Sequence, residues 1–398
     1  MARKINIEAL LAGCADDSFD AGIRIDTELV PLAGPGGPVK PAVYEGGVYQ
    51  QDRRWAAPGD AEATPVIVID NVPSQANRLE DALRRHRDST SIPELVLDLS
   101  QLEHLPAHLP QRLSSLQFPH RSADAYLRDA RLGDQDFIKT ELGRAIFGAT
   151  AQACGPLMAW FPQALLYGFW QSHLGKKGHN SKHARAWVSE IIGWHPATTE
   201  TRVLGLKGDP LNLNTDEAVT SNPDDRTKWD VGKGERVEGG KNDKLSEIGH
   251  GQVPFMGADA TAASVSFARV TQRATVSFAQ LRRIGLGDRT DEADTAARAL
   301  LVALGLHAHQ LAFGRGFALR SGADLRPEAT TVTWLGSDGD EACDVGDAEV
   351  TRGLLQSARK HAQSVKVPLD GWNEQPTVLL PKDNLLSAIR STWPELGD

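Results

Sequence analysis

The feature that most constrains the fold is residues 66–86, which predict a buried strand, a turn and an amphipathic helix. The first four, residues 66–69, are all β-branched, as in a strand covered on both faces. Asx residues and a proline at 70–73 then predict a turn, after which Ser74 is expected to cap the helix. The polar side and first turn of this helix carry Gln75, Asn77, Arg78, Arg84 and Arg85.

The start of this helix is a candidate anion site. A helix N-terminus offers free N–H groups and the positive end of the helix dipole, which suit phosphate. The alternative interpretation is an ordinary strand–helix unit whose polar side faces water. The residues alone leave both open.

The size and composition of the chain fit a folded protein without a membrane anchor. Its 398 residues, 40% of them hydrophobic, allow two or three average domains or one core with large insertions. The N-terminal residues lack the apolar region of a signal peptide, and the apolar stretches are too short to cross a bilayer. Cys14, Cys154 and Cys343 lie far apart, which favours a reducing cytoplasm over a disulfide framework or a zinc site.

The net charge of −9 argues at first against nucleic-acid binding, but the charges are unevenly distributed. Residues 142–189, 260–287 and 295–323 contain lysine or arginine and no acidic residue. Acidic residues gather instead at 216–243 and 338–349. This segregation permits a basic groove on an acidic body, as a polyanion binder needs.

Cations alternate with aromatic residues just before the buried strand. A Gly/Pro-rich loop at 33–38 is followed by Tyr44, Tyr49, Arg53, Arg54 and Trp55. Single-stranded nucleic acid is bound in this way, with charges on phosphates and rings on bases. A mobile surface loop is the alternative.

Two further segments suggest phosphate contacts. His120 and Arg121 precede an expected helix begun by Ser122, again near a helix N-terminus. Residues 173–185 are the densest cationic stretch and include Lys176, Lys177, Lys182 and Arg185. The histidines of this stretch lack a nearby carboxylate, so phosphate contact is favoured over metal binding, and a solvated loop remains open. The aromatic segment 160–170 between these regions is expected in the core.

The rest of the chain indicates an α+β protein. Residues 207–255 are polar with little periodicity, and Gly249, His250 and Gly251 could let backbone approach a ligand. Alternation at 265–278 predicts strands, Asp291 begins a clear helix, and 330–335 predicts another strand. Strands and helices interleave without a regular βαβ repeat, so we expect an α+β core carrying large insertions.

The order of these segments resembles the "Cas seven" group of RAMP proteins, the repeated backbone subunit of type I CRISPR Cascade complexes, in subtype I-G (formerly I-U). The resemblance spans residues 20–325. It rests on the motifs at residues 23–25, 33–37, 44–47, 74–80, 119–124, 248–254, 279–283 and 319–321, each weak alone. No motif after Ser337 matches.

The resemblance implies an RRM-like (ferredoxin-like) palm with finger and thumb insertions. The palm would occupy residues 1–336, with 207–255 as the candidate thumb or finger and 337–398 as an extension of the same domain. Copies of such a subunit form a filament along the guide RNA (crRNA) in the cytoplasm and leave its bases free to pair with target DNA. The implied partners are crRNA, target DNA, other copies, the large and fused guide-processing subunits and a recruited helicase-nuclease. No enzyme activity, cofactor, metal or membrane contact is expected.

We predict RNA contacts by residues drawn from all these segments: Arg53, Arg54, Gln75, Asn77, Arg78, His120, Arg121, Lys176, Lys177, Lys182, Arg185, His250, Arg282 and Arg320. Arg78 has the alternative of an intrahelical ion pair with Asp81. Asp70 invites comparison with RNA-cleaving relatives, but no base or metal cluster is evident beside it. Two other functions stay open, a metal-dependent ribonuclease of the same fold and a protein-only scaffold.

Overall fold

The computed structural model describes residues 3–45, 47–102, 105, 109–172, 181–197, 210–211, 213–214, 216–234, 236–250, 264–373 and 375–391. The chain forms two compact units, each described here by itself. The larger unit comprises residues 1–42, 49–197 and 264–392, and the smaller one residues 43–48, 198–263 and 393–398.

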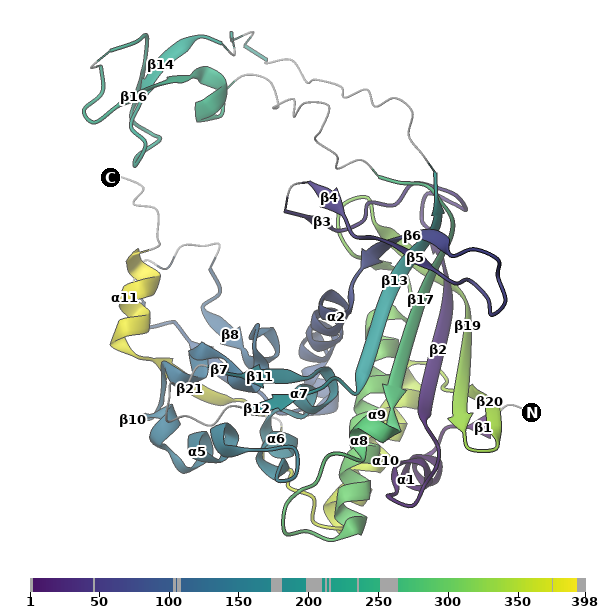
Figure 1. Cartoon of the computed structure of the whole chain (residues 1–398). Coiled ribbons are helices and arrows are strands. Elements are labelled where there is room, and N and C mark those ends of the chain that lie inside the picture. Colours follow the sequence, from purple (N-terminus) through teal and green to yellow (C-terminus); the bar gives the residue numbers. More distant parts are fainter. Residues whose placement is uncertain are drawn as a thin grey trace. The chain divides into compact units, whose positions relative to one another are not determined.

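A large mixed β-sheet forms the centre of the larger unit, and its strands follow the order β1-β20-β19-β2-β17-β13-β6-β5. Neighbouring strands are antiparallel except β1 and β20, which are parallel. Figure 1 shows β13, β17, β2 and β19 side by side. The strands are β1 (Arg3–Lys4), β2 (Gly22–Pro31), β5 (Gln51–Arg54), β6 (Thr64–Asp70), β13 (Trp187–Pro196), β17 (Phe267–Ser277), β19 (Asp324–Gly336) and β20 (Gly339–Asp344), with β18 (Phe317–Ala318) on β19.

Helices cover one face of this sheet. The long helix α9 (Asp291–Phe313) contacts α1 (Ile7–Cys14), α2 (Val72–Arg85) and α10 (Ala348–Ser364), and α2 contacts β13. Gly305 lets α9 approach the sheet closely, because a Cβ there would lie 2.7 Å from the indole ring of Trp187. The buried side chains of β17 point to this face and include Val270, Gln272, Ala274 and Val276.

The other face of the sheet is open and carries charges of both signs. Arg273 and Arg24 both pair with Asp26, at 2.6 and 2.9 Å. Arg269 pairs with Glu28 at 3.8 Å, and its guanidinium lies over the Trp194 ring. Adjacent strands therefore compensate one another's charges across this face.

A second, five-stranded sheet in the same unit has the order β10-β9-β21-β7-β8. Its central strand β21 comes from the C-terminal region and pairs in parallel with β7, so distant parts of the chain meet here. The strands are β7 (Leu95–Asp98), β8 (Arg112–Ser114), β9 (Ala130–Leu132), β10 (Gln135–Asp136) and β21 (Thr377–Pro381).

Short elements complete both units. In the larger unit β11 (Phe169–Gln171) and β12 (Ser181–His183) form a hairpin, and the remaining helices are α3 (Arg87–Thr90), α4 (Ala125–Arg128), α5 (Glu141–Gly148), α6 (Gly155–Trp160), α7 (Pro162–Tyr167), α8 (Phe278–Leu281) and α11 (Asp383–Ser391). Turns of 3₁₀-helix occupy Ser115–Gln117, Arg121–Ala123, Phe137–Lys139 and Leu245–Ile248. The smaller unit holds a sheet of β14 (Ala218–Ser221), β15 (Trp229–Val231) and β16 (Lys241–Lys244), and β3 (Val43–Tyr44) pairs with β4 (Val48–Tyr49).

The α+β class is confirmed, with local corrections. The cap of α2 is Asn71, whose side chain accepts a hydrogen bond from the Ser74 amide at 3.1 Å, whereas the Ser74 hydroxyl donates to Asp70. Trp170 is not in the core: 64% of it is exposed, because strand alternation in β11 turns its ring outward.

The expectation that no apolar stretch could cross a bilayer also needs correction. Helix α9 has 23 residues, and an 18-residue window of it has a mean hydropathy of 1.2, enough by length and composition to span a membrane. However, 83% of this apolar segment is buried inside the protein, as in the central helix of a folded core.

Candidate nucleic-acid interface

The residues after strand β6 form a cluster around the carboxylate of Asp70, which is fully buried. Arg78 of α2 donates to Asp70 through Nε (2.9 Å) and Nη2 (3.1 Å). Arg320, which follows β18, donates from Nη2 at 2.8 Å. Gln75 Nε2 and Ser74 Oγ add hydrogen bonds of 2.5 and 2.9 Å. One carboxylate thus holds two guanidinium groups, and the cluster keeps a net charge of +1.

This pairing overturns the alternative of an Arg78–Asp81 ion pair. Asp81 pairs instead with Arg84 and Arg85, both at 2.7 Å. Arg78 pairs with Asp70 rather than with Asp81. Two parallel N–H bonds to a buried carboxylate form a stronger interaction than an ion pair on the helix surface.

The protonation of Asp70 links this cluster to stability. Burial alone would raise the pKa of Asp70, but the hydrogen bond and charge of Arg78, with Gln75 and Ser74, bring the pKa below its usual range. A lowered pKa in the folded state contributes stability at neutral pH, and this contribution disappears as the pH falls through that pKa. We therefore expect Asp70→Asn to lower the urea midpoint at pH 7, and the difference from wild type to shrink below about pH 4. A difference that stays constant down to about pH 2 would contradict this.

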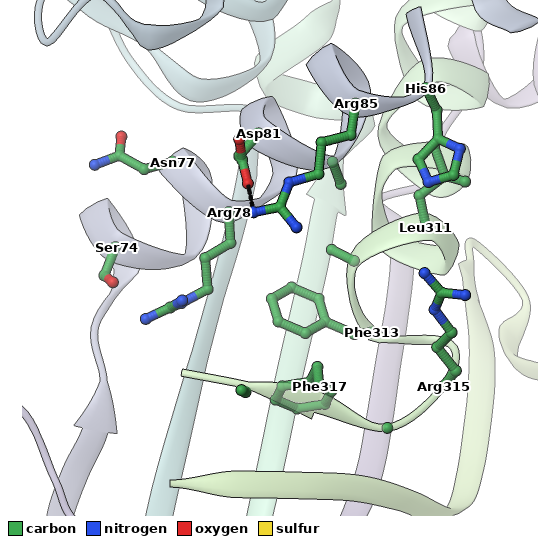
Figure 2. A pocket seen from close by; sticks show the side chains of 14 residues that line it. Ser74, Asn77, Arg78, Asp81, Arg85, His86, Leu311, Phe313, Arg315 and Phe317 are labelled. Atoms are coloured by element: carbon green, nitrogen blue, oxygen red, sulfur yellow. Dashed lines mark ion pairs between the residues drawn. The ribbon is translucent and has the colours of Figure 1, made fainter. Parts of the chain in front are cut away.

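An open cavity of about 670 Å³ lies between α2 and the segment after α9, and we call it the α2 groove. Figure 2 shows Arg78 and Arg85 of α2 and Arg315 of the following segment around this hollow, with Phe313 and Phe317 on one wall. Ser74, Asn77, His86 and the carboxylate of Asp81 also line it. The α2 groove therefore combines positive charge, polar groups and aromatic rings.

A second cavity, of about 770 Å³, lies beside the β11–β12 hairpin, and we call it the hairpin groove. It brings together four predicted contacts, His120, Arg121, Lys182 and Arg185. Trp170 also lines it and stands directly opposite Lys182 in the strand register. An exposed indole beside cations is the combination that binds stacked bases and phosphates.

The positive charge of the hairpin groove is not cancelled locally. Neither Lys182 nor Arg185 forms an ion pair with a carboxylate in the part of the chain that the structure describes. Partial burial, and then the nearby charge of Arg121, lowers the pKa of Arg185. A phosphate in the groove would relieve this repulsion.

Arg121 stabilises the hairpin groove from its buried side. Its guanidinium is buried and bonds Glu80 of α2 through Nε (2.7 Å) and Nη2 (2.8 Å). Its Nη1 donates to the carbonyl of Gly168, just before β11, at 3.1 Å. Arg121 thereby ties the hairpin to α2 and has little surface left for a ligand.

Both grooves extend to the first turn of α2. Val72 lines the hairpin groove and Ser74 lines the α2 groove, two residues apart in the first helical turn. The predicted anion site at this helix start therefore lies between two larger cationic cavities.

The remaining predicted contacts lie elsewhere. Gln75 is fully buried and bonds Asp70, Gln272 and Ser189, so it cannot touch a ligand in this conformation. Arg282 donates to the carbonyls of Gly13 and Asp20.

Arg53 and Arg54 are on the edge strand β5. Arg53 donates to the Ala63 carbonyl, and Arg54 binds Glu190 and Asp52. His250 belongs to the smaller unit, where its ring contacts Trp229. Lys176 and Lys177 lie outside the described residues.

The sequence interpretation missed Trp170, Arg85 and Arg315 as parts of the grooves. The basic window 295–323 includes Arg315, but the sequence alone does not place this residue beside α2. Among the described residues, no group of three His, Cys, Asp or Glu side chains is arranged to hold a metal ion.

Comparison with known families gives a match to a CRISPR-associated family. Residues 23–197 match the family described as CRISPR-associated protein GSU0053, a family of the Cas seven/RAMP type. The matched segment includes α2, the β11–β12 hairpin with Lys182, and Arg185 after the hairpin. No curated protein matches the chain. Over residues 23–197 this match bears out the predicted CRISPR-associated family, and subtype I-G stays a prediction.

Proposed function

We propose that this CRISPR-associated protein, whose residues 23–197 belong to the GSU0053 family, is a crRNA-binding backbone subunit of a type I surveillance complex. Copies would line up along the guide RNA and present it for pairing with target DNA. The proposed partners are the guide, the target DNA reached through it, other copies and the other Cascade subunits. Subtype I-G and a cytoplasmic location are part of this proposal.

The hairpin groove carries the proposal. Its exposed Trp170 faces Lys182 across the hairpin, and Arg185 and His120 line the same cavity. Rings and uncompensated cations bind single strands without reading base edges, as a subunit that accepts any guide must do. We therefore propose Trp170, Lys182, Arg185, His120, Asn77, Arg78 and Arg315 as the contacts, and Gln75, Arg121 and Arg282 as supporting residues.

The chain order of the main sheet supports an RRM-like palm. The elements β2, α2, β13, β17, α9 and β19 follow the strand–helix–strand–strand–helix–strand order of ferredoxin-like folds. Strands β13 and β17 pair as neighbours, and β2 lies between β17 and β19. We propose that the smaller unit, inserted between β13 and β17, is the thumb or finger.

The open face of this sheet is an unfavourable path for the guide. Its arginines are already paired with Asp26, Glu28 and Glu190, and these carboxylates would repel phosphate. The two grooves on either side of the α2 start offer net positive charge instead. We propose that the guide runs there.

The test is co-expression with a CRISPR array and the guide-processing subunit. We expect purified material with a high 260/280 nm absorbance ratio, containing RNA of guide length protected from nuclease in a large particle. A monomer with a protein-like ratio at moderate salt would contradict the proposal and favour a protein-only scaffold. Cleavage of RNA that stops when a chelator is added would favour the ribonuclease.

A further inference from the structure

Asp70 and Asp81 each pair with two arginines, but in opposite settings. Asp81 is partly exposed on α2 and pairs with Arg84 and Arg85 of the same helix, within about one turn. Asp70 is fully buried and joins Arg78 of α2 to Arg320, which lies 242 residues further along the chain. The first pairing is local, whereas the second fixes two distant segments against each other.

The bonds to Asp70 leave one side of Arg78 available. Its Nε and Nη2 are held by Asp70, and Nη2 also donates to the Leu319 carbonyl at 3.1 Å. Within the described part of the chain, Nη1 has no hydrogen-bond partner, and 26% of the Arg78 side chain is exposed, at the α2 groove. The Nη1 group is therefore left free to donate to a ligand, and the bonds to Asp70 fix its orientation.

Arg320 makes the net charge of the Asp70 cluster positive. Alone, Arg78 and Asp70 would form a neutral pair with little attraction for an anion. Arg320 adds a second positive charge, and its Nη1 is anchored by the carbonyls of Lys40 and Ile69 at 3.1 and 3.0 Å. The cluster stays at +1 while Arg78 stays rigid.

We propose that Asp70 is a positioning residue, which holds Arg78 so that its Nη1 donates a hydrogen bond to a phosphodiester of the RNA strand. This inference rests on the proposed function. It assigns a role to the Asp70 carboxylate, for which the sequence left both a nuclease role and a structural role open. Asp70 itself touches no RNA in this account. A buried carboxylate here increases RNA affinity by orienting a guanidinium, although its own charge is negative.

The test compares Asp70→Asn with Asp81→Asn, since each removes one negative charge that pairs with two arginines. The full-length protein is titrated with a fluorescent 20-nucleotide oligouridylate at several salt concentrations, and its urea midpoint is measured without RNA. We expect Asp70→Asn to raise the Kd about tenfold and to flatten the salt dependence by about one phosphate contact. Asp81→Asn is expected to bind as tightly as wild type or more tightly, because the groove gains net positive charge.

A second variant keeps the test decisive if Asp70→Asn fails to fold. Arg78→Lys retains the charge on a partly exposed side chain but cannot bond Asp70 with two parallel N–H groups. We expect about a tenfold loss of affinity for this variant as well. Wild-type affinity in Arg78→Lys, or tighter binding in Asp70→Asn as in Asp81→Asn, would overturn the positioning role alone. Absence of RNA binding by the wild-type protein would overturn the proposed function and this inference together.

Discussion

Replacing Arg121 with methionine is expected to lower the free energy of unfolding by about 3–5 kcal/mol. The substitution leaves the buried carboxylate of Glu80 without the guanidinium that binds both of its oxygens. Burial already raises the pKa of Glu80, with Arg121 opposing that shift. The loss of stability is measured as a lower midpoint of urea unfolding, monitored by circular dichroism.

A double variant separates the desolvation of Glu80 from the loss of packing. Glu80→Leu together with Arg121→Met replaces both charges by apolar groups of similar length, which is often nearly neutral. We expect the double variant to recover most of the stability that Arg121→Met loses. Equal destabilisation of the single and double variants would contradict a buried ion pair as the cause.

Replacing Trp170 with alanine is expected to weaken RNA binding about 10- to 100-fold with little change in stability. Stacking of one base on an aromatic ring contributes about 1–3 kcal/mol. The indole is 64% exposed, so the folded state loses few contacts when it is removed. Fluorescence anisotropy with a single-stranded RNA measures the effect.

Trp55 provides the matched control for this substitution. It is 61% exposed, similar to Trp170, and lies after Arg53 and Arg54 on the edge strand, outside both grooves. We expect Trp55→Ala to bind RNA as wild type does. A strong defect in Trp55→Ala with none in Trp170→Ala would move the interface to the β5 edge.

Local sequence signals predicted the parts of the fold that depend on neighbouring residues. The β-branched run 66–69 lies within strand β6, and most of the alternating segment 265–278 lies within β17. The helix expected from Asp291 is α9, since its apolar residues repeat at helical spacing. These signals depend only on residues within one helical turn or one strand, so they can be recognised in a single sequence.

Long-range pairing explains what the sequence could not show. Asp70 takes Arg78 and Arg320, and Arg121 turns inward to Glu80, because burial strengthens charge-assisted hydrogen bonds between segments that meet only after folding. An arginine in sequence therefore gives no sign of whether it faces a ligand or a carboxylate. Trp170 was missed for a related reason: its apolar neighbours indicated core, whereas the hairpin register exposes it.

The most direct test of the central claim is to map where the guide lies on the protein. The chain is purified with guide RNA containing 4-thiouridine, irradiated, and the crosslinked peptides are identified by mass spectrometry. We expect crosslinks at peptides carrying Trp170, Lys182 or the first turn of α2. Crosslinks confined to β2 and β17 on the open face of the sheet, or to residues 51–55, would contradict it.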